Sequence, residues 1–146
     1  MRPLLHHVLV IAQLIGVALA IVPEMDGRQS GLAWLVVAGL GIALGATTLC
    51  FNRVGNFSIY PAPRPGAQLI TRGPYRWVRH PMYVSLALMM VGIAGYNQGP
   101  RNALAAALVI AVVMVKAAIE ERLMGAQYLE YEAYRSATRR FIPYLY

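Results

Sequence analysis

The chain has 146 residues, of which 58% are hydrophobic and only 13% are charged, and its formal net charge is +7. Soluble domains carry about 25% charged residues, so this composition excludes an ordinary soluble domain and indicates an integral membrane protein. The arginines flank apolar segments, and we therefore attribute the positive charge to membrane topology and anionic lipids and expect no nucleic-acid partner. The one cysteine, Cys50, excludes an intramolecular disulfide and a cysteine-rich zinc site.

Two apolar runs, residues 4–22 and 32–51, predict the first two transmembrane helices. The first run is long and is not followed by a small-x-small cleavage site, which favours a membrane span over a signal peptide. Gln13 lies in its middle, where we expect it to form a hydrogen bond to another helix. The second run contains Gly41-x-x-x-Gly45, a small-residue pattern typical of packed membrane helices.

The segment 52–80 is predicted to be a long, ordered loop over the cytoplasmic membrane surface. Prolines at positions 61, 63 and 65 exclude a helix there. The loop carries Arg53, Arg64, Arg72, Arg76 and Arg79, and the C-terminal tail carries Arg122, Arg135, Arg139 and Arg140. This distribution predicts four spans with both termini in the cytoplasm, and we expect the protein in a prokaryotic inner membrane as a single integral membrane domain.

Two further spans are predicted at residues 81–96 and 102–119, followed by an interfacial helix over 120–140. Pro81 suits the first position of a helix, which places His80 at the N-cap and leaves backbone N–H groups for an anion. A helix from there to Gly95 is only about 24 Å long, so its start should be recessed below the membrane surface. Tyrosines at 128, 131 and 134 share one face of the interfacial helix, as expected at the headgroup level.

The third and fourth spans form an antiparallel hairpin, and this brings residues almost forty positions apart to one site. We expect His80 and Tyr83 at the start of one helix to meet Lys116, Glu120 and Glu121 at the end of the other. The site opens to the cytoplasmic side.

Residues 73–83 read Gly-Pro-Tyr-Arg-Trp-Val-Arg-His-Pro-Met-Tyr, and Glu120-Glu121 and Arg140-Phe141-Ile142-Pro143 follow downstream. This pattern resembles the isoprenylcysteine carboxyl methyltransferases and the related phospholipid N-methyltransferases. The resemblance covers the chain from Gln68 to its end, and the combination of Arg-His-Pro-x-Tyr with Glu-Glu is what makes it specific. The four spans predicted for this chain are fewer than those of the carboxyl methyltransferase itself.

The resemblance implies an all-α polytopic membrane enzyme that uses S-adenosylmethionine. The cofactor-binding residues it implies are Gly73, Tyr75, His80, Tyr83, Glu120 and Glu121. The backbone N–H groups at the helix start suit the carboxylate, either glutamate suits the amine or ribose, and the two tyrosines suit the sulfonium. The catalytic set is Arg79, His80 and Arg140, in which the arginines would clamp an anionic acceptor. The acceptor would be a lipid or a small lipophilic molecule with a carboxylate, amine or thiol.

Two other classes remain open at this point. Sterol reductases have a similar Arg-His-Pro-x-Tyr hairpin and use NADPH. A non-enzymatic protein that binds haem or lipid could use His6, His7 and His80 as ligands, although neighbouring histidines do not share a helix face, and we predict no metal site. A purely structural interpretation makes Arg79 a membrane anchor and pairs Lys116 with Glu120 at i,i+4. The oligomeric state is not indicated.

Overall fold

The computed structural model describes residues 2–24, 31–52, 56, 58–61 and 66–143. In these ranges the chain forms α1 (Arg2–Ile21), α2 (Ala33–Phe51), the 3₁₀ turn η1 (Gly73–Arg76), α3 (Pro81–Asn97), α4 (Pro100–Gln127) and α5 (Tyr131–Ala137). Helices α1, α2 and α4 are long and apolar enough to cross a membrane, and α3 is a shorter apolar helix. The predicted all-α, polytopic membrane architecture is confirmed.

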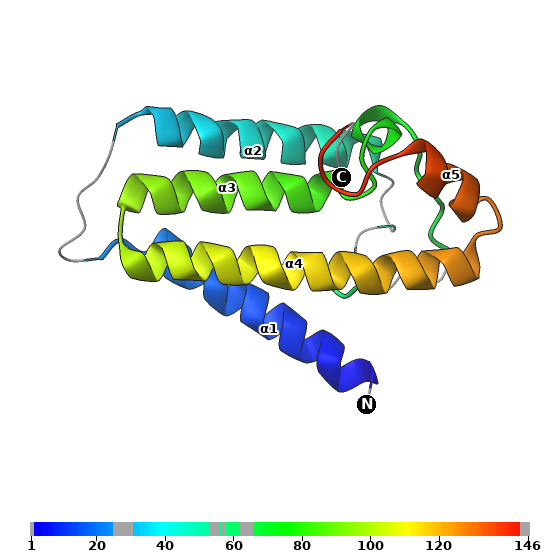
Figure 1. Ribbon diagram of the computed structural model, residues 1–146, viewed down its shortest axis with the longest axis horizontal. Coiled ribbons are helices and arrows are strands. Elements are labelled where there is room, and N and C mark those ends of the chain that lie inside the picture. The colour runs from blue at the N-terminus through cyan, green and yellow to red at the C-terminus, as the bar shows by residue number, and fades with distance from the viewer. Residues whose placement is uncertain (1, 25–30, 53–55, 57, 62–65, 144–146) are drawn as a thin grey trace.

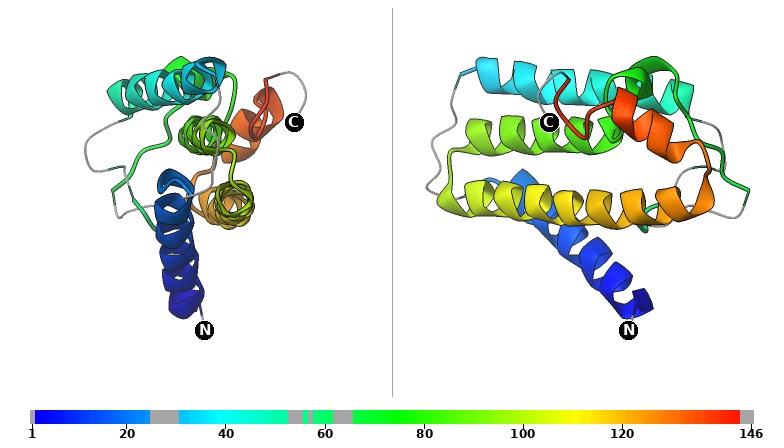
Figure 2. Two further views of the ribbon diagram at one scale, coloured as in Figure 1. Left: turned by 90° about the vertical axis from the view of Figure 1, so that its left-hand side faces the viewer. Right: turned by 45° about the vertical axis from the view of Figure 1, so that its right-hand side comes forward.

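Helix α3 lies between α2 and α4, and the three run side by side (Figure 1). Helix α1 packs across α4, and its N-terminal end diverges from the bundle, as both views of Figure 2 show. Helix α4 continues well past the start of α3, so the N-terminal end of α3 is recessed relative to its neighbour (Figure 1). The candidate functional site lies at this recessed end.

Small residues let α2 and α3 approach closely. A Cβ atom on Gly41 would lie 2.7 Å from the backbone nitrogen of Met89, and one on Gly92 would lie 2.4 Å from that of Ala38. The Ser85 hydroxyl also donates a hydrogen bond of 2.8 Å to the carbonyl of Gly41. The predicted role of the Gly41–Gly45 pattern in helix packing is therefore confirmed.

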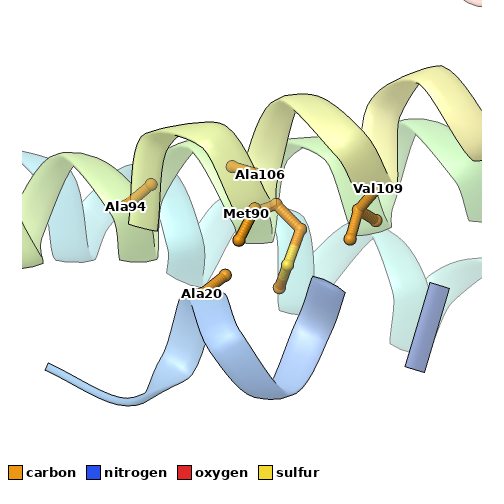
Figure 3. Close-up of a cluster of buried hydrophobic side chains, with 6 residues drawn as sticks. Ala20, Met90, Ala94, Ala106 and Val109 are labelled. Carbon is orange, nitrogen blue, oxygen red and sulfur yellow. The ribbon is translucent and has the colours of Figure 1, made fainter. Parts of the chain in front are cut away.

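A small apolar cluster joins α1, α3 and α4 near the opposite end of the bundle. Figure 3 shows Ala20 of α1 facing Met90 and Ala94 of α3 and Ala106 and Val109 of α4. The amide of Asn102 donates to the carbonyls of Ala20 and Val22, both at 2.9 Å, and so satisfies groups that the end of α1 leaves without a partner. These contacts fix α1 against the α3–α4 hairpin.

The later helices have different bounds from those expected. Residues 120–122 do not end the fourth helix, because they are good helix formers and the two glutamates have partners beside the helix. Helix α4 therefore runs on to Gln127, and only the seven-residue α5 follows, in place of an interfacial helix over 120–140. Arg53 and Arg64, predicted in the cytoplasmic loop, lie outside the described residues.

Substitution of two glycines of α2 tests how closely this helix packs against α3. We expect Gly41→Ala to lower the melting temperature in detergent, because overpacking of a tight contact costs about 1–3 kcal/mol. Gly39→Ala is the matched control, since a Cβ atom there would meet nothing within 4 Å. Equal melting temperatures for the two variants would contradict the packing described here.

Candidate functional site

A cavity of about 380 Å³ lies at the recessed end of α3. Its wall combines apolar side chains of α1, α3 and α4 with residues of the loop before η1. Of the residues predicted for the site, it contains Tyr75, Arg79, His80, Tyr83 and Glu120. The predicted hairpin geometry thus brings these side chains together. Gly73, Glu121 and Arg140 are not part of the wall.

Pro81 is the first residue of α3 and His80 is its N-cap, as predicted, but the His80 side chain makes no capping hydrogen bond. The backbone N–H of His80 donates to the carbonyl of Arg140 at 3.2 Å. Those of Tyr83 and Val84 donate to the carbonyl of His80, at 3.0 and 3.1 Å. Two of the N–H groups at the His80–Tyr83 helix start, which we expected to bind an anion, therefore already have acceptors, and so does the next one, that of Val84.

Both ring nitrogens of His80 face carboxylates. Nδ1 lies 3.4 Å from Glu120 Oε2, and Nε2 lies 3.3 Å from Glu121 Oε1. A neutral imidazole donates from one nitrogen only, so this arrangement favours the imidazolium. Burial lowers the pKa of His80, but its hydrogen bonds to Glu120 and Glu121 outweigh burial and raise it above the usual value.

Glu121, which does not line the cavity, is the centre of an ion cluster. Its carboxylate accepts hydrogen bonds from Arg79 Nε at 2.8 Å, from Arg140 Nε at 3.1 Å and from Arg140 Nη2 at 2.5 Å. Arg79 also donates through Nη1 to the carbonyls of Arg135 and Thr138, at 3.0 and 2.6 Å. Both arginines expected to clamp an acceptor are therefore bound to a buried carboxylate of the protein itself.

The ion cluster is reinforced by the backbone. Val78 and Arg139 form an isolated parallel bridge, in which the N–H of Arg79 donates to the carbonyl of Arg139 at 2.8 Å. The N–H of Arg139 donates in turn to the carbonyl of Trp77 at 3.1 Å. The C-terminal segment is thereby held alongside the start of α3.

Glu120 faces the cavity, in contrast to Glu121. The Tyr83 hydroxyl donates a short hydrogen bond to Glu120 Oε1, and the two rings of His80 and Tyr83 stack with their centroids 5.5 Å apart. Burial and the nearby Glu120 raise the pKa of Tyr75 to about 12, so its hydroxyl stays protonated. Glu120 is thus the carboxylate that a molecule in the cavity would meet.

Three tyrosines predicted at the membrane interface instead line the cavity. Tyr128 donates to the carbonyl of Ala67 at 2.7 Å, and Tyr134 donates to the carbonyl of Tyr75 at 2.8 Å. Tyr131 is only 3% exposed. The three-residue spacing of these tyrosines predicts that they share one face of a long helix. The chain instead breaks between α4 and α5, and the three side chains turn toward the cavity.

Gly73 has a packing role in this structure. It adopts φ +60°, and a Cβ atom there would lie 2.4 Å from the ring of Phe51 in α2. Only glycine combines this backbone conformation with so close an approach. The position fixes η1 against the end of α2, and its predicted place in the cofactor site is not supported by its location.

Lys116 was expected in the site and Gln13 was expected to bond to another helix, but their contact with each other and with Ile59 was not predicted from the sequence. Lys116 Nζ donates to Gln13 Oε1 at 2.8 Å and to the carbonyl of Ile59 at 2.7 Å. This confirms the predicted interhelical hydrogen bond of Gln13. The signal in the sequence was a polar residue in the middle of each of two apolar runs, Gln13 in the first and Lys116 in the fourth.

Apolar helices long enough to span a membrane surround a cavity with a carboxylate, an ammonium and six tyrosines in its wall, and these features define a helical membrane protein with a cavity of the size of a small molecule. The phospholipid methyltransferase family model matches residues 33–130, and the chain belongs to this family of membrane methyltransferases. The resemblance seen in the sequence is confirmed. The match includes α2, α3 and α4 but neither α1 nor α5.

Two curated relatives carry names that refer to metal resistance. The nickel-cobalt-cadmium resistance protein NccN of Alcaligenes xylosoxydans xylosoxydans is 30% identical over 116 residues, which are 77% of this chain and 53% of the relative. The cobalt-zinc-cadmium resistance protein CzcN of Cupriavidus metallidurans is 29% identical over 114 residues, 75% of this chain and 52% of the relative. The chain spans about half the length of both. Among its described residues, no group of three or more His, Cys, Asp or Glu is placed to hold a metal ion.

The ion cluster gives the first prediction for the site. We expect Glu121→Gln to lower stability strongly, because removing one partner of a buried ion pair costs about 3–5 kcal/mol. Glu120→Gln should be much milder, since it leaves both arginines on Glu121. Thermal unfolding of the two variants in detergent measures the difference. A Glu121→Gln protein as stable as the wild type would show that the cluster does not hold the C-terminal segment.

The raised pKa of His80 gives a pH-dependent prediction. Because the folded protein binds this proton more tightly, the stabilising contribution is fully present below the unfolded pKa of about 6.5. It is lost as the pH rises through the higher folded pKa. We therefore expect the difference in melting temperature between wild type and His80→Asn to shrink between pH 6 and pH 9. A difference that stays constant or grows over this range would contradict the imidazolium assignment.

Proposed function

We propose that this chain is an S-adenosylmethionine-dependent membrane methyltransferase that acts on a lipid or a small lipophilic acceptor. The observation that carries the proposal is the convergence of Glu120, Tyr75, Tyr83 and His80 on one cavity in a member of a methyltransferase family. When bound, the cofactor supplies a methyl group activated by its sulfonium. Everything else required of the site is binding, orientation and exclusion of water by the protein.

The cavity suits a cofactor that combines cationic groups with hydroxyls and a flat purine. Glu120 offers a carboxylate, and Tyr75 and Tyr83 offer aromatic rings and hydroxyls. Apolar side chains such as those of Leu86 and Met89 complete the wall. The volume of about 380 Å³ lies at the lower end of the range of roughly 300–1,000 Å³ usual for small-molecule sites.

In this proposal Glu120 binds the amine or the ribose hydroxyls of the cofactor. A positive centre near the faces of Tyr75 and Tyr83 would gain roughly 0.5–2 kcal/mol, depending on how fully it loses water. His80 is a positioning residue that orients Glu120 through Nδ1 and joins it to the ion cluster through Nε2. Arg79 and Arg140 act in the same way, by holding Glu121. We leave Gly73 and Glu121 out of the cofactor-binding set.

The chemistry also restricts the acceptor. In-line methyl transfer depends on near-attack geometry, which is worth up to about 7–11 kcal/mol. A carboxylate, amine or thiol would each serve as acceptor, but none would be clamped by Arg79 or Arg140, which are bound to Glu121. Apolar residues of α1, among them Val10 and Leu14, suit a lipophilic molecule. The arginine distribution favours a site at the cytoplasmic face.

Ligand-induced stabilisation tests the proposal against the other classes. We expect S-adenosylhomocysteine, the product of the cofactor, to raise the melting temperature of the detergent-purified protein, and NADPH and haem to leave it unchanged. Glu120→Gln should weaken this binding about 10- to 150-fold, as for the loss of a charged hydrogen bond of roughly 1.5–3 kcal/mol. Glu132→Gln is the control, because that side chain is 80% exposed.

Transfer of a labelled methyl group from the cofactor into a lipid and metabolite extract then identifies the acceptor class. Stabilisation by NADPH or haem without any effect of S-adenosylhomocysteine would refute the proposed function.

A further inference from the structure

Lys116 is a buried lysine in the wall of the cavity. It is only 2% exposed, although lysine is almost never fully buried without a partner for its charge. Its two hydrogen-bond acceptors, Gln13 Oε1 and the carbonyl of Ile59, are both neutral oxygens. Among the described residues it forms no salt bridge with a carboxylate. The hydrogen bonds that hold this group in place are thus accepted by neutral oxygens.

The donor count of Lys116 leaves room for a ligand. An ammonium carries three N–H donors, and two of them reach the oxygens of Gln13 and Ile59. Nζ also lies 5.8 Å from the centroid of the Tyr83 ring, whose hydroxyl donates to Glu120. Lys116, Tyr83 and Glu120 all line the same cavity. The binding of an opposite charge beside the ammonium would offset part of the free-energy cost of burying it.

Glu120 provides the complementary charge one helical turn away. Residues at i and i+4 are neighbours on a helix surface, so Lys116 and Glu120 present an ammonium and a carboxylate from the same side of α4. An α-amino acid carries an amine and a carboxylate on a single carbon atom. Lys116 is therefore suited to the carboxylate of such a group, and Glu120 is suited to its amine.

We infer that Lys116, held by Gln13 and Ile59, is the binding subsite for the carboxylate of the amino-acid part of the methyl donor. The inference rests on the proposed function and adds the residue that takes this charge. It replaces the backbone N–H groups at the start of α3, since those of His80, Tyr83 and Val84 already have acceptors. It also gives α1, which lies outside the family match, a part in cofactor binding through Gln13.

A matched pair of ligands tests the inference without an activity measurement. S-adenosylhomocysteine and its decarboxylated analogue differ only in the carboxylate, and calorimetry on the detergent-purified protein gives both affinities. We expect the wild type to prefer S-adenosylhomocysteine roughly 10- to 100-fold, as for a charged hydrogen bond. Lys116→Gln, which keeps donors for Gln13 and Ile59 but removes the charge, should reduce this preference to a few-fold.

The ratio of the two affinities serves as an internal control, because a general disturbance of the cavity would weaken both ligands alike. Arg122→Gln removes one positive charge from an exposed position of the same helix and should leave the ratio unchanged. If Lys116→Gln does not fold, Lys116→Met, which matches the length of the apolar stem, is the second variant.

The outcomes separate the two proposals. A wild type that binds S-adenosylhomocysteine but shows no preference for the carboxylate would overturn the inference and leave the proposed function intact. The same holds if Lys116→Gln keeps the full preference, because Lys116 would then have a structural role only. A wild type that binds neither ligand would overturn both.

Discussion

The structure depends most on the carboxylate of Glu121, which is 6% exposed at its side chain and holds three parts of the chain together. It binds Arg79 and His80 from the start of α3 and Arg140 from the C-terminal segment, while lying itself on α4. Taking these charges out of water is costly, and the cost is offset only because the carboxylate accepts several hydrogen bonds, three at Oε1 and one at Oε2. The walls of the cavity have a fixed relative position because this cluster lies directly behind them.

Two neighbouring glutamates near the C-terminal end of α4 have different roles. Consecutive residues of a helix point about 100° apart, so Glu120 and Glu121 serve different faces. Glu121 faces the ion cluster, whereas Glu120 faces the cavity together with Tyr83. His80 contacts both, with one ring nitrogen on each carboxylate. A single imidazole therefore connects the structural cluster to the wall of the cavity.

The sequence predicted the parts of this arrangement that follow from periodicity and helix-boundary chemistry. Apolar run lengths located the helices, Pro81 located the start of α3, and the hairpin placed His80 opposite Glu120 and Glu121. The partners of Arg79 and Arg140 could not be predicted, because a charged residue in a motif has the same appearance whether it meets a ligand or a buried carboxylate. The inward tyrosines were missed because their direction depends on a break in the helix at residues 128–130, where no proline or glycine marks it.

The parallel bridge between Val78 and Arg139 has a consequence for the order of folding. The two paired residues are about sixty positions apart in sequence, so their pairing closes a long loop. The entropy cost of closing this loop falls once α3 and α4 have packed together. Residues 138–140 follow α4 in the chain, so they are synthesised after the helical hairpin. Until they pair with the start of α3, Glu121 lacks Arg140 as a partner. The pairing of residues 139 and 140 thus completes the ion cluster, and a chain truncated before them would have the long helices of the protein without this cluster.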